Sequence, residues 1–256
     1  MPRTFRITVE YDGAAWCGWQ RQAVDPSIQG ALEEVFSTLS GQAVTVHGSG
    51  RTDAGVHALG QVAHFTCETN MEPDQLLRGG NSLLPPDIVI RECAEAPPGF
   101  HARYDVVSKL YAYHMAHGGT RPAVGRQYSW HIHRSLDVFA MERAAGHFLG
   151  THDFAAFEGV GSPRTTTVRT VSLSRLEAED NRLTFQVRAD GFLRYMVRNL
   201  VGTLKEVGAG KIDPEAIPGI LASKNRALAG PTAPPQGLFL MEVEYGPPGA
   251  RKGTPA

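Results

Sequence analysis

The sequence is poor in cysteine and contains no long apolar run. Its three cysteines (Cys17, Cys67 and Cys93) form no Cys-x-x-Cys pair, which argues against a disulfide framework and suits a reducing cytoplasm. No apolar stretch approaches the ~18 residues of a membrane-spanning helix. The N-terminal residues enter a strand pattern without the apolar block of a signal peptide. We therefore expect a cytoplasmic protein with no membrane segment.

Several motifs of cofactor and metal enzymes are also missing. The chain has no Walker A loop, no Gly-x-Gly-x-x-Gly between a strand and a helix, no His-Glu-x-x-His and no Gly-x-Ser-x-Gly. Nucleotide cofactors and serine-nucleophile chemistry are therefore disfavoured. The ten histidines leave a weaker alternative, a zinc-dependent hydrolase. Its candidate ligands would be His131, His133, His147, His152 and Asp153.

Lysine is scarce as well. Of the 25 positively charged residues, 20 are arginine and five are lysine, while the net charge is −1. Arginine is suited to bidentate phosphate recognition and to stacking on bases, although a codon bias explains the same ratio. Nucleic-acid binders are often strongly basic overall. If this protein binds an anionic polymer, we expect it to use a local arginine-rich patch.

What the sequence does contain is a repeated order of secondary structure. Hydrophobic residues at 42% and charged residues at 20% fit a globular protein of 256 residues with a sizeable core. In the first half, alternating and helical apolar spacings predict the order β-α-β-β-α-β. The predicted strands are 5–11, 43–48, 60–67 and 87–96, and the predicted helices are 25–41 and 72–84.

The second half repeats this order. Its predicted strands are 108–117, 167–179, 181–190 and 237–245, and its predicted helices are 135–150 and 192–208. Two such repeats predict an α+β fold of two ferredoxin-like units, with antiparallel sheets, helices on one face and a concave cleft on the other. The predicted subdomains are 1–105 and 106–246, linked by a hinge at 96–108 and followed by a loose tail at 247–256.

Three features of the sequence are candidates for chemistry. The stretch HGSGRTDAGVHALGQ (47–61) places one carboxylate, Asp53, in a glycine-rich bend with Arg51 two residues before it. Such a bend is also what an ordinary turn would show. Tyr111 and Tyr113 share one face of their strand, either to pack in a core or to stack on bases. In the last predicted helix, a basic edge flanks the apolar stripe: Arg194, Arg198 and Lys205.

The motifs together resemble the tRNA pseudouridine synthase A family. GSGRTDAGVHALGQVAHF resembles the family signature around its Arg-Thr-Asp-Ala-Gly-Val-His core, and RITVEYDGAAWCGWQRQ resembles the first strand and its loop. NSLLPPDIVI, FHARYDVVSKLYAYHM, GFLRYMVRNLVGTL and GLFLMEVEY resemble later family segments, in family order. The resemblance covers residues 3–246, with no departure at a motif position. It implies the pseudouridine synthase fold.

The same resemblance implies a reaction and a set of site residues. The enzyme would need no cofactor and no metal, and it would isomerise uridine to pseudouridine at positions 38, 39 and 40 of the tRNA anticodon stem-loop, as a homodimer. Asp53 would be the catalytic nucleophile and Arg198 its paired arginine. Tyr111 would stack on the target base, Arg51 would help to hold the flipped nucleotide, and Leu240 would line the pocket or belong to the core.

Two other functions stay open from the residues alone. A non-catalytic RNA-binding module with two repeats is disfavoured because the aromatic RNP1 pattern is absent and Asp53 would have no role. The histidine-based hydrolase is the third hypothesis. The residues do not decide whether Asp53 would attack the sugar, attack the uracil ring or remove a ribose proton.

Overall fold

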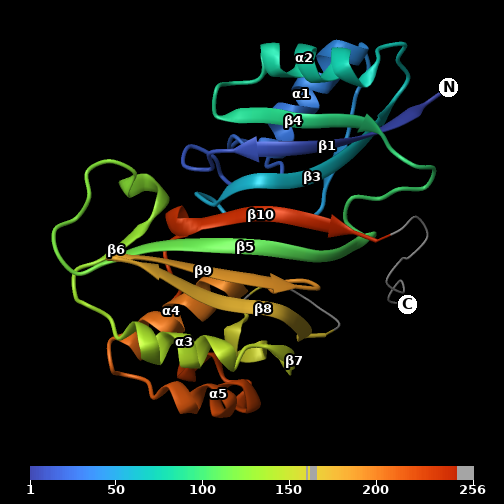
Figure 1. Ribbon diagram of the computed structural model, residues 1–256. Coiled ribbons are helices and arrows are strands. Elements are labelled where there is room, and N and C mark those ends of the chain that lie inside the picture. The colour runs from blue at the N-terminus through green and yellow to red at the C-terminus, as the bar shows by residue number, and fades with distance from the viewer. Residues whose placement is uncertain (160, 162–165, 247–256) are drawn as a thin grey trace. The chain divides into compact units, whose positions relative to one another are not determined.

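The computed structural model describes residues 1–159, 161 and 166–246 (Figure 1). These residues form two compact units, of which the second spans Ser108–Leu238 and the first holds the described residues on either side of it. The predicted tail, 247–256, lies outside the described residues. Strands and helices occur in both units, so the α+β class is confirmed.

The first unit contains a sheet in the order β4-β1-β3-β10, with β2 paired to β3. Its strands are β1 (Arg3–Tyr11), β2 (Val46–Gly48), β3 (His57–Cys67), β4 (Ile88–Glu95) and β10 (Leu238–Tyr245). Two helices, α1 (Ile28–Ser40) and α2 (Pro73–Leu83), cover one face (Figure 1). The Phe36 ring of α1 stacks on Phe65 of β3 with centroids 4.0 Å apart, which places the core between helices and sheet.

Local sequence explains these elements directly. Along β1, Phe5, Ile7 and Val9 are fully buried while the residues between them are partly exposed, as the period of two predicts. Helix α1 begins after Ser27, whose side chain accepts a hydrogen bond from the Gly30 amide. It ends at Gly41, whose φ of 70° suits a glycine C-cap.

The second unit contains strands in the order β5-β9-β8-β7, with β6 paired to β5. The strands are β5 (Val106–His117), β6 (Trp130–Ile132), β7 (Gly150–Asp153), β8 (Val168–Glu179) and β9 (Arg182–Ala189). The helices are α3 (Val138–Gly146), α4 (Met196–Gly208) and α5 (Ile217–Ser223). Most residues of helix α4 between Met196 and Val207 are buried in the core.

Two predicted helices are shorter than expected. Helix α3 ends at Gly146, not at residue 150, because Phe148 is buried in a turn against Phe157 and Gly150 opens strand β7 with a φ of 99°. Helix α4 begins at Met196, not at residue 192, because Tyr195 has a left-handed φ of 60° that interrupts the helix. In both cases apolar residues continue at helical spacing into the neighbouring turn, so periodicity alone could not locate the end of the helix.

Most of the strand pairs are antiparallel, as predicted, but parallel pairs occur as well. Strand β10 runs parallel to β3, and β6 runs parallel to β5, so each unit contains one parallel pair. Phe239 and Leu240 pair with His57 and Ala58 of β3, and the described residues from Phe239 on cluster with the first unit, whereas the predicted second subdomain was 106–246. A strand's own sequence carries no signal for the partner it will find across the chain.

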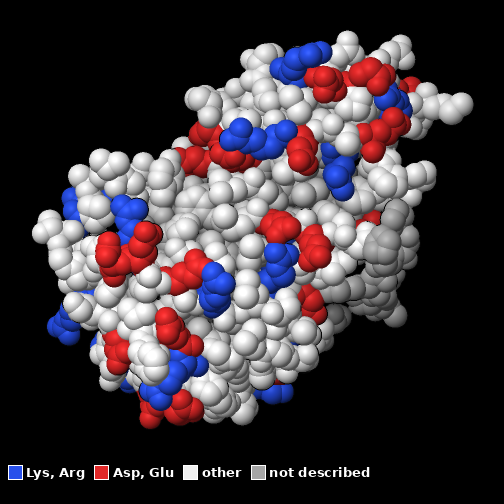
Figure 2. Space-filling view, in the orientation of Figure 1, with Lys and Arg blue, Asp and Glu red and all other residues white. Residues whose placement is uncertain are grey.

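The described surface carries both signs of charge. On the face drawn in Figure 2, Lys and Arg side chains are interspersed with Asp and Glu in both units. Several charged side chains of the described residues form ion pairs, such as Arg91 with Glu10 at 2.6 Å and Lys224 with Asp153 at 2.8 Å. Among the described residues, each helix is too short or too polar to cross a membrane.

Candidate functional site

Asp53 lies in the loop between β2 and β3, at the first position of a tight turn. The Val56 amide donates a hydrogen bond to the Asp53 carbonyl at 3.1 Å, and Gly55 has a φ of 76°, as a turn with glycine at its third position requires. Asp53 is half-buried. The turn expected from the residue types is therefore present, with Asp53 partly exposed.

A second segment packs against this turn and fixes its backbone. The Trp19 amide donates to the Thr52 carbonyl at 3.1 Å, and the Gly55 amide donates to the Trp16 carbonyl at 3.3 Å. Gly18 makes this approach possible: a Cβ there would lie 2.5 Å from the Thr52 oxygen, and its φ of 89° is one that L side chains rarely adopt. The glycine in CGWQ is thus required by contact with the Asp53 loop.

Buried polar groups support the loop from below. The hydroxyls of Tyr11 and Thr52 lie 2.8 Å apart, and burial raises the pKa of Tyr11 to about 12, against the opposing hydrogen bonds from Thr52 and Gln61. The Ser49 hydroxyl donates to the fully buried Gln61 side chain at 2.6 Å, and Gln61 donates to the Gly50 carbonyl. Because each of these buried groups has a partner, the loop has a defined conformation.

Arg51 lies in the same loop and is exposed to solvent. Its Nε donates a hydrogen bond to the side-chain oxygen of Gln20 at 2.9 Å. Gln20 in turn belongs to the segment that packs against the turn. The guanidinium is therefore held at one nitrogen by a neutral side chain, which leaves its positive charge uncompensated by that contact.

Leu240 belongs to the core of the first unit. It pairs with Ala58 across the parallel β10–β3 ladder and is 1% exposed. Its neighbour Phe239 stacks on the His57 ring, with centroids 4.6 Å apart. This position is the one expected of a core residue, and a role in lining a substrate pocket stays a prediction.

Tyr111 lies on β5 in the second unit, opposite Val187 of β9. Its ring meets Phe192 edge to face at 5.0 Å, and 8% of the residue is exposed. Tyr113, two residues further on, is fully buried, and its hydroxyl donates to the Pro234 carbonyl at 2.7 Å. Burial raises the pKa of Tyr113 well above its ordinary value. The two tyrosines share a face, as predicted, and Tyr113 belongs to the core.

Arg198 lies in the first turn of α4, where two contacts orient it. Its Nε donates to the Ala233 carbonyl at 2.7 Å, and its guanidinium carbon lies 4.9 Å from the centre of the Tyr195 ring. Arg194 lies 4.8 Å from the centre of the same ring. Arg194 thus precedes the helix and does not belong to its edge, and Lys205 is paired with Glu206 at 2.7 Å. The predicted basic edge of the helix is reduced to Arg198.

Tyr195 is a residue that sequence analysis did not single out. It has a left-handed backbone, which is uncommon for a bulky residue, and its ring contacts both Arg194 and Arg198. The only available signal was its place in LRYMVR, between those arginines. Nothing in residue spacing predicts a positive φ at a tyrosine, because the strain is tolerated only where surrounding contacts enforce it.

The candidate residues fall into two groups. Asp53, Arg51 and Leu240 belong to the first unit, whereas Tyr111 and Arg198 belong to the second. Within the first unit, Arg51 and Asp53 share one braced loop. The pairing of Asp53 with Arg198 stays a prediction from the family resemblance.

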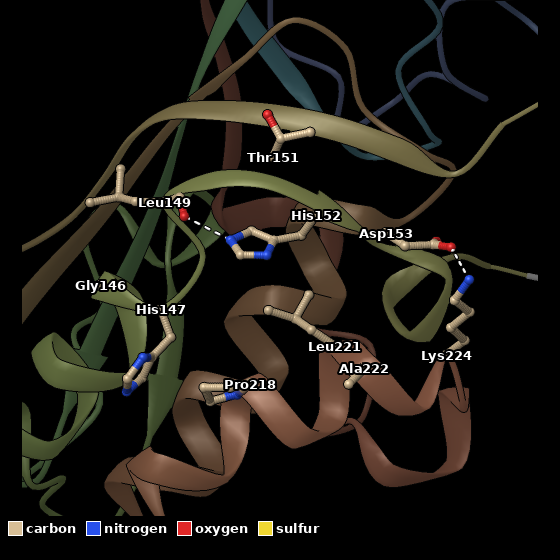
Figure 3. Close-up of a pocket in the computed structure, with 10 residues that line it drawn as sticks. All are labelled: Gly146, His147, Leu149, Thr151, His152, Asp153, Pro218, Leu221, Ala222 and Lys224. Atoms are coloured by element: carbon tan, nitrogen blue, oxygen red, sulfur yellow. Dashed lines mark hydrogen bonds and ion pairs between the residues drawn. The ribbon is translucent and has the colours of Figure 1, made fainter.

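The histidines of the alternative zinc site are engaged elsewhere. His131 contacts the Gly118 carbonyl at 3.3 Å, His147 contacts Glu215 at 3.2 Å, and His152 contacts the Leu149 carbonyl at 2.7 Å. His147 and His152 line a cavity of about 560 Å³. Figure 3 shows their rings well apart, with the ion pair of Asp153 and Lys224 on the other side of His152. Within the described ranges, His, Cys, Asp and Glu side chains form no group of three with metal-binding geometry.

Comparison with known proteins places this architecture in a family. The family model described as tRNA pseudouridine synthase matches residues 7–105 and 144–246. The chain is 44% identical over 243 residues to "tRNA pseudouridine synthase A" of Acetivibrio thermocellus and, equally, to that of Geotalea daltonii. Each match covers 95% of this chain and 100% of the relative. A solved Cbf5-Nop10-Gar1 complex shows a distant likeness over 78% of this chain and 45% of its own, with 13% identity and a TM-score of 0.35.

Proposed function

This chain belongs to the tRNA pseudouridine synthase family, and on that premise we propose that Asp53 is the carboxylate that performs its reaction. The enzyme is an isomerase that acts on tRNA. The observation that carries the proposal is the matched segment 7–105, which includes the Arg-Thr-Asp-Ala-Gly-Val-His loop. Asp53 is the one carboxylate in that loop, and its backbone is braced by Trp19 and Gly18.

The chemistry explains why a single carboxylate is enough. The C1′–N1 glycosidic bond breaks, the uracil turns, and a C1′–C5 bond forms. C5 loses its proton and N1 gains one, so the atoms balance and no electrons enter or leave. A carboxylate can attack C1′, add to the uracil ring or remove a ribose proton, and each route begins from an ionised Asp53.

The other candidate residues take supporting roles in the proposal. Arg198 pairs with Asp53 and favours its charged form. Tyr111 stacks on the target base, and Arg51 holds the flipped nucleotide. Flipping costs a few kcal/mol of lost base stacking, which stacking on an aromatic ring and contacts to phosphate must offset. Leu240 provides an apolar wall.

Three finer parts of the proposal concern substrate, assembly and compartment. We expect uridines 38, 39 and 40 of the anticodon stem-loop to be modified, by a homodimer, in the cytoplasm. The free thiols of Cys17, Cys67 and Cys93 suit a reducing compartment. Light scattering of the purified protein tests the dimer, because a monomeric mass at working concentration contradicts it.

The decisive experiment incubates the purified protein with unmodified tRNA, without added metal, and maps pseudouridine by position. Wild-type protein should modify positions 38–40, with and without a chelator. Asp53→Asn should lose several orders of magnitude in rate, as expected for removal of a catalytic nucleophile, yet bind tRNA within about tenfold of wild type. Asp25→Asn, in an exposed loop of the same unit, is the matched control and should be fully active.

Each other outcome favours a different function. Tight tRNA binding without any pseudouridine would support the non-catalytic RNA-binding module. Activity that disappears with the chelator would revive a metal-dependent reaction. Substantial turnover by Asp53→Asn would show that another group does the chemistry.

A further inference from the structure

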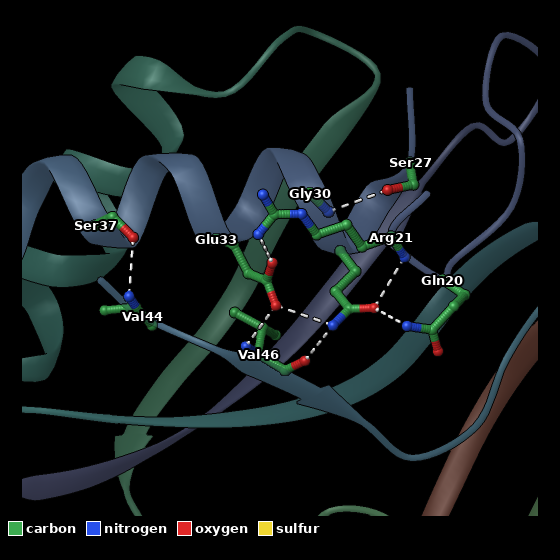
Figure 4. A network of polar contacts seen from close by, with 9 residues as sticks. Gln20, Arg21, Ser27, Gly30, Glu33, Ser37, Val44 and Val46 are labelled. Atoms are coloured by element: carbon green, nitrogen blue, oxygen red, sulfur yellow. Dashed lines mark hydrogen bonds and ion pairs between the residues drawn. The ribbon is translucent and has the colours of Figure 1, made fainter. Parts of the chain in front are cut away.

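Arg51 lies at the end of a chain of side-chain hydrogen bonds that starts inside the first unit. Glu33, on helix α1, is a carboxylate of which only 5% is exposed. One of its oxygens, Oε1, accepts hydrogen bonds from the Val46 amide at 3.1 Å and from the side chain of Gln29 at 2.9 Å. Figure 4 shows Glu33 pointing from the helix toward Val46, below the helix axis. A buried carboxylate in this position is costly unless it is fully bonded.

Gln29 carries the chain outward from Glu33. Its amide nitrogen donates to Glu33 and to the Val46 carbonyl at 3.1 Å, while its oxygen accepts from the side chain of Gln20 at 2.8 Å and from the Arg21 amide at 3.0 Å. Every donor and acceptor of this amide group is therefore used. The orientation of Gln29 is fixed, and it fixes which end of the Gln20 amide faces inward.

The last link reaches the loop of the proposed catalytic residue. Because the Gln20 nitrogen donates to Gln29, its oxygen faces outward and accepts from Nε of Arg51 at 2.9 Å. The order Glu33, Gln29, Gln20, Arg51 thus has one donor direction throughout. Reversing any one amide would oppose two donors or two acceptors.

We propose that Gln20 and Gln29 are positioning residues that aim the Arg51 guanidinium at the substrate nucleotide. This inference rests on the proposed function of the Asp53 loop. The Gln20 contact uses only Nε, so the two terminal nitrogens of Arg51 keep the planar, two-pronged donor face that recognises a phosphate or a carbonyl. The uncharged relay orients Arg51 and leaves its positive charge in place. A carboxylate at position 20 would neutralise that charge.

The negative charge of Glu33, at the inner end of the relay, has an arginine partner other than Arg51. Arg21 donates to the second oxygen of Glu33 at 2.9 Å, so the buried carboxylate has a positive partner of its own. Figure 4 shows the guanidinium of Arg21 above Glu33, on the side away from Val46. Glu33 therefore fixes the inner end of the relay, and its negative charge is neutralised by Arg21 and not by Arg51.

The test compares Gln20→Leu with Gln22→Leu in single-turnover assays on unmodified tRNA. Gln22 is in the same loop, is exposed, and bonds only the Cys17 carbonyl, at 3.3 Å, among the interactions of the described residues. Gln20→Leu should slow the step at saturating tRNA roughly tenfold, as misplacement of a binding group does. Its tRNA affinity and melting temperature should match those of Gln22→Leu, which should react at the wild-type rate.

A double-mutant cycle separates aiming from general support of the loop. In an Arg51→Met background, Gln20→Leu should add less than about a twofold loss, because the group that it positions is already gone. Gln29→Met, which does not contact Arg51, should show the same dependence on Arg51.

The outcomes are distinguishable from failure of the proposed function. If Asp53→Asn is inactive and Arg51→Met is slowed but Gln20→Leu equals Gln22→Leu, the relay is wrong and the site stands. If Gln20→Leu slows the reaction as much in the Arg51→Met background as in wild type, Gln20 supports the loop and does not position Arg51. If Asp53→Asn is active, the function itself is wrong, whatever Gln20 does.

Discussion

The two units hold their candidate residues by different means. In the first unit, the backbone around Asp53 is fixed by the hydrogen bonds from the Trp19 amide to Thr52 and from the Gly55 amide to Trp16, and by the close approach of Gly18. In the second, Arg198 is fixed by its own side chain, through the Ala233 carbonyl and the Tyr195 ring. The first arrangement keeps a main-chain turn rigid, whereas the second positions a charge at the start of a helix.

The helices that support these residues begin differently as well. Helix α1 has a side-chain N-cap, Ser27, and no charged group in its first turn. Helix α4 begins after Tyr195, which has a left-handed backbone and provides no side-chain cap. A left-handed residue other than glycine costs on the order of 1–2 kcal/mol. Cation–π contacts of about 0.5–1 kcal/mol each, from Arg194 and Arg198, offset that strain. The start of α4 thus combines a strained backbone residue with the arginine for which we propose a role in the reaction.

The largest effect is expected from removing that charge. Arg198→Met should reduce the single-turnover rate about a hundredfold or more, the loss typical of one preorganised electrostatic contact. Arg198→Lys should fall between this variant and wild type, because it keeps the charge but not the planar fork. Lys205→Met is the control on the same helix and should retain wild-type rates. An active Arg198→Met would reduce Arg198 to a structural residue.

A substitution at Gly18 tests the other half of the comparison. Gly18→Ala should destabilise the protein by roughly 2–3 kcal/mol and lower activity, because it combines a positive φ with a clash against Thr52. Gly41 also has a positive φ, of 70°, but open space surrounds it. Gly41→Ala should therefore cost about 1 kcal/mol of unfolding free energy and leave the rate unchanged. If Gly18→Ala and Gly41→Ala lost the same unfolding free energy in urea and the same activity, Gly18 would have no special role.

Acid should weaken the first unit more than the second. The pKa of His64 is lowered to about 4, mainly by burial and also by the imidazoles of His101 and His47, against weaker opposing effects of a backbone hydrogen bond with His47 and of Asp105. Because the unfolded state binds the proton first, stability should fall as the pH drops from about 6.5 toward 4. His64→Asn keeps an acceptor for the Ala102 amide without titrating, so it should flatten this dependence.

The matched control for this pH dependence lies in the second unit. The pKa of His114 is lowered by burial alone, so His114→Asn should flatten the pH dependence less than His64→Asn does. Urea unfolding of the three proteins at several pH values measures both effects. Identical profiles for His64→Asn and wild type would show that His64 does not control acid stability.

The smallest effect is expected at the cap of α1. Ser27→Ala should lower the free energy of unfolding by about 1 kcal/mol, because the Gly30 amide loses its side-chain acceptor. The single-turnover rate should stay at the wild-type value.

Tyr195→Gly should be nearly neutral in stability, since relief of backbone strain offsets the lost ring contacts, but it should slow the reaction. If both variants changed only stability, the contrast between the two helix starts would be without functional meaning.

Local patterns determined much of this protein in advance. The alternation along β1, the capped run from Ser27 to Gly41 and the order of elements in the first unit followed from the sequence. These features depend on neighbours a few residues apart, which a sequence displays directly. The signature around Asp53, together with the later motifs, was enough to indicate the family that comparison confirmed.

Tertiary contacts alone decided the rest. Tyr195 has a left-handed backbone where Arg194 and Arg198 both contact its ring, and β10 joins β3 because a strand pairs wherever its hydrogen bonds are best met. The relay from Glu33 to Arg51 depends on which amide end faces inward, and that was settled by groups far apart in the sequence. Residue types allow such contacts, but only the folded arrangement of α1, β2 and the loops selects among them.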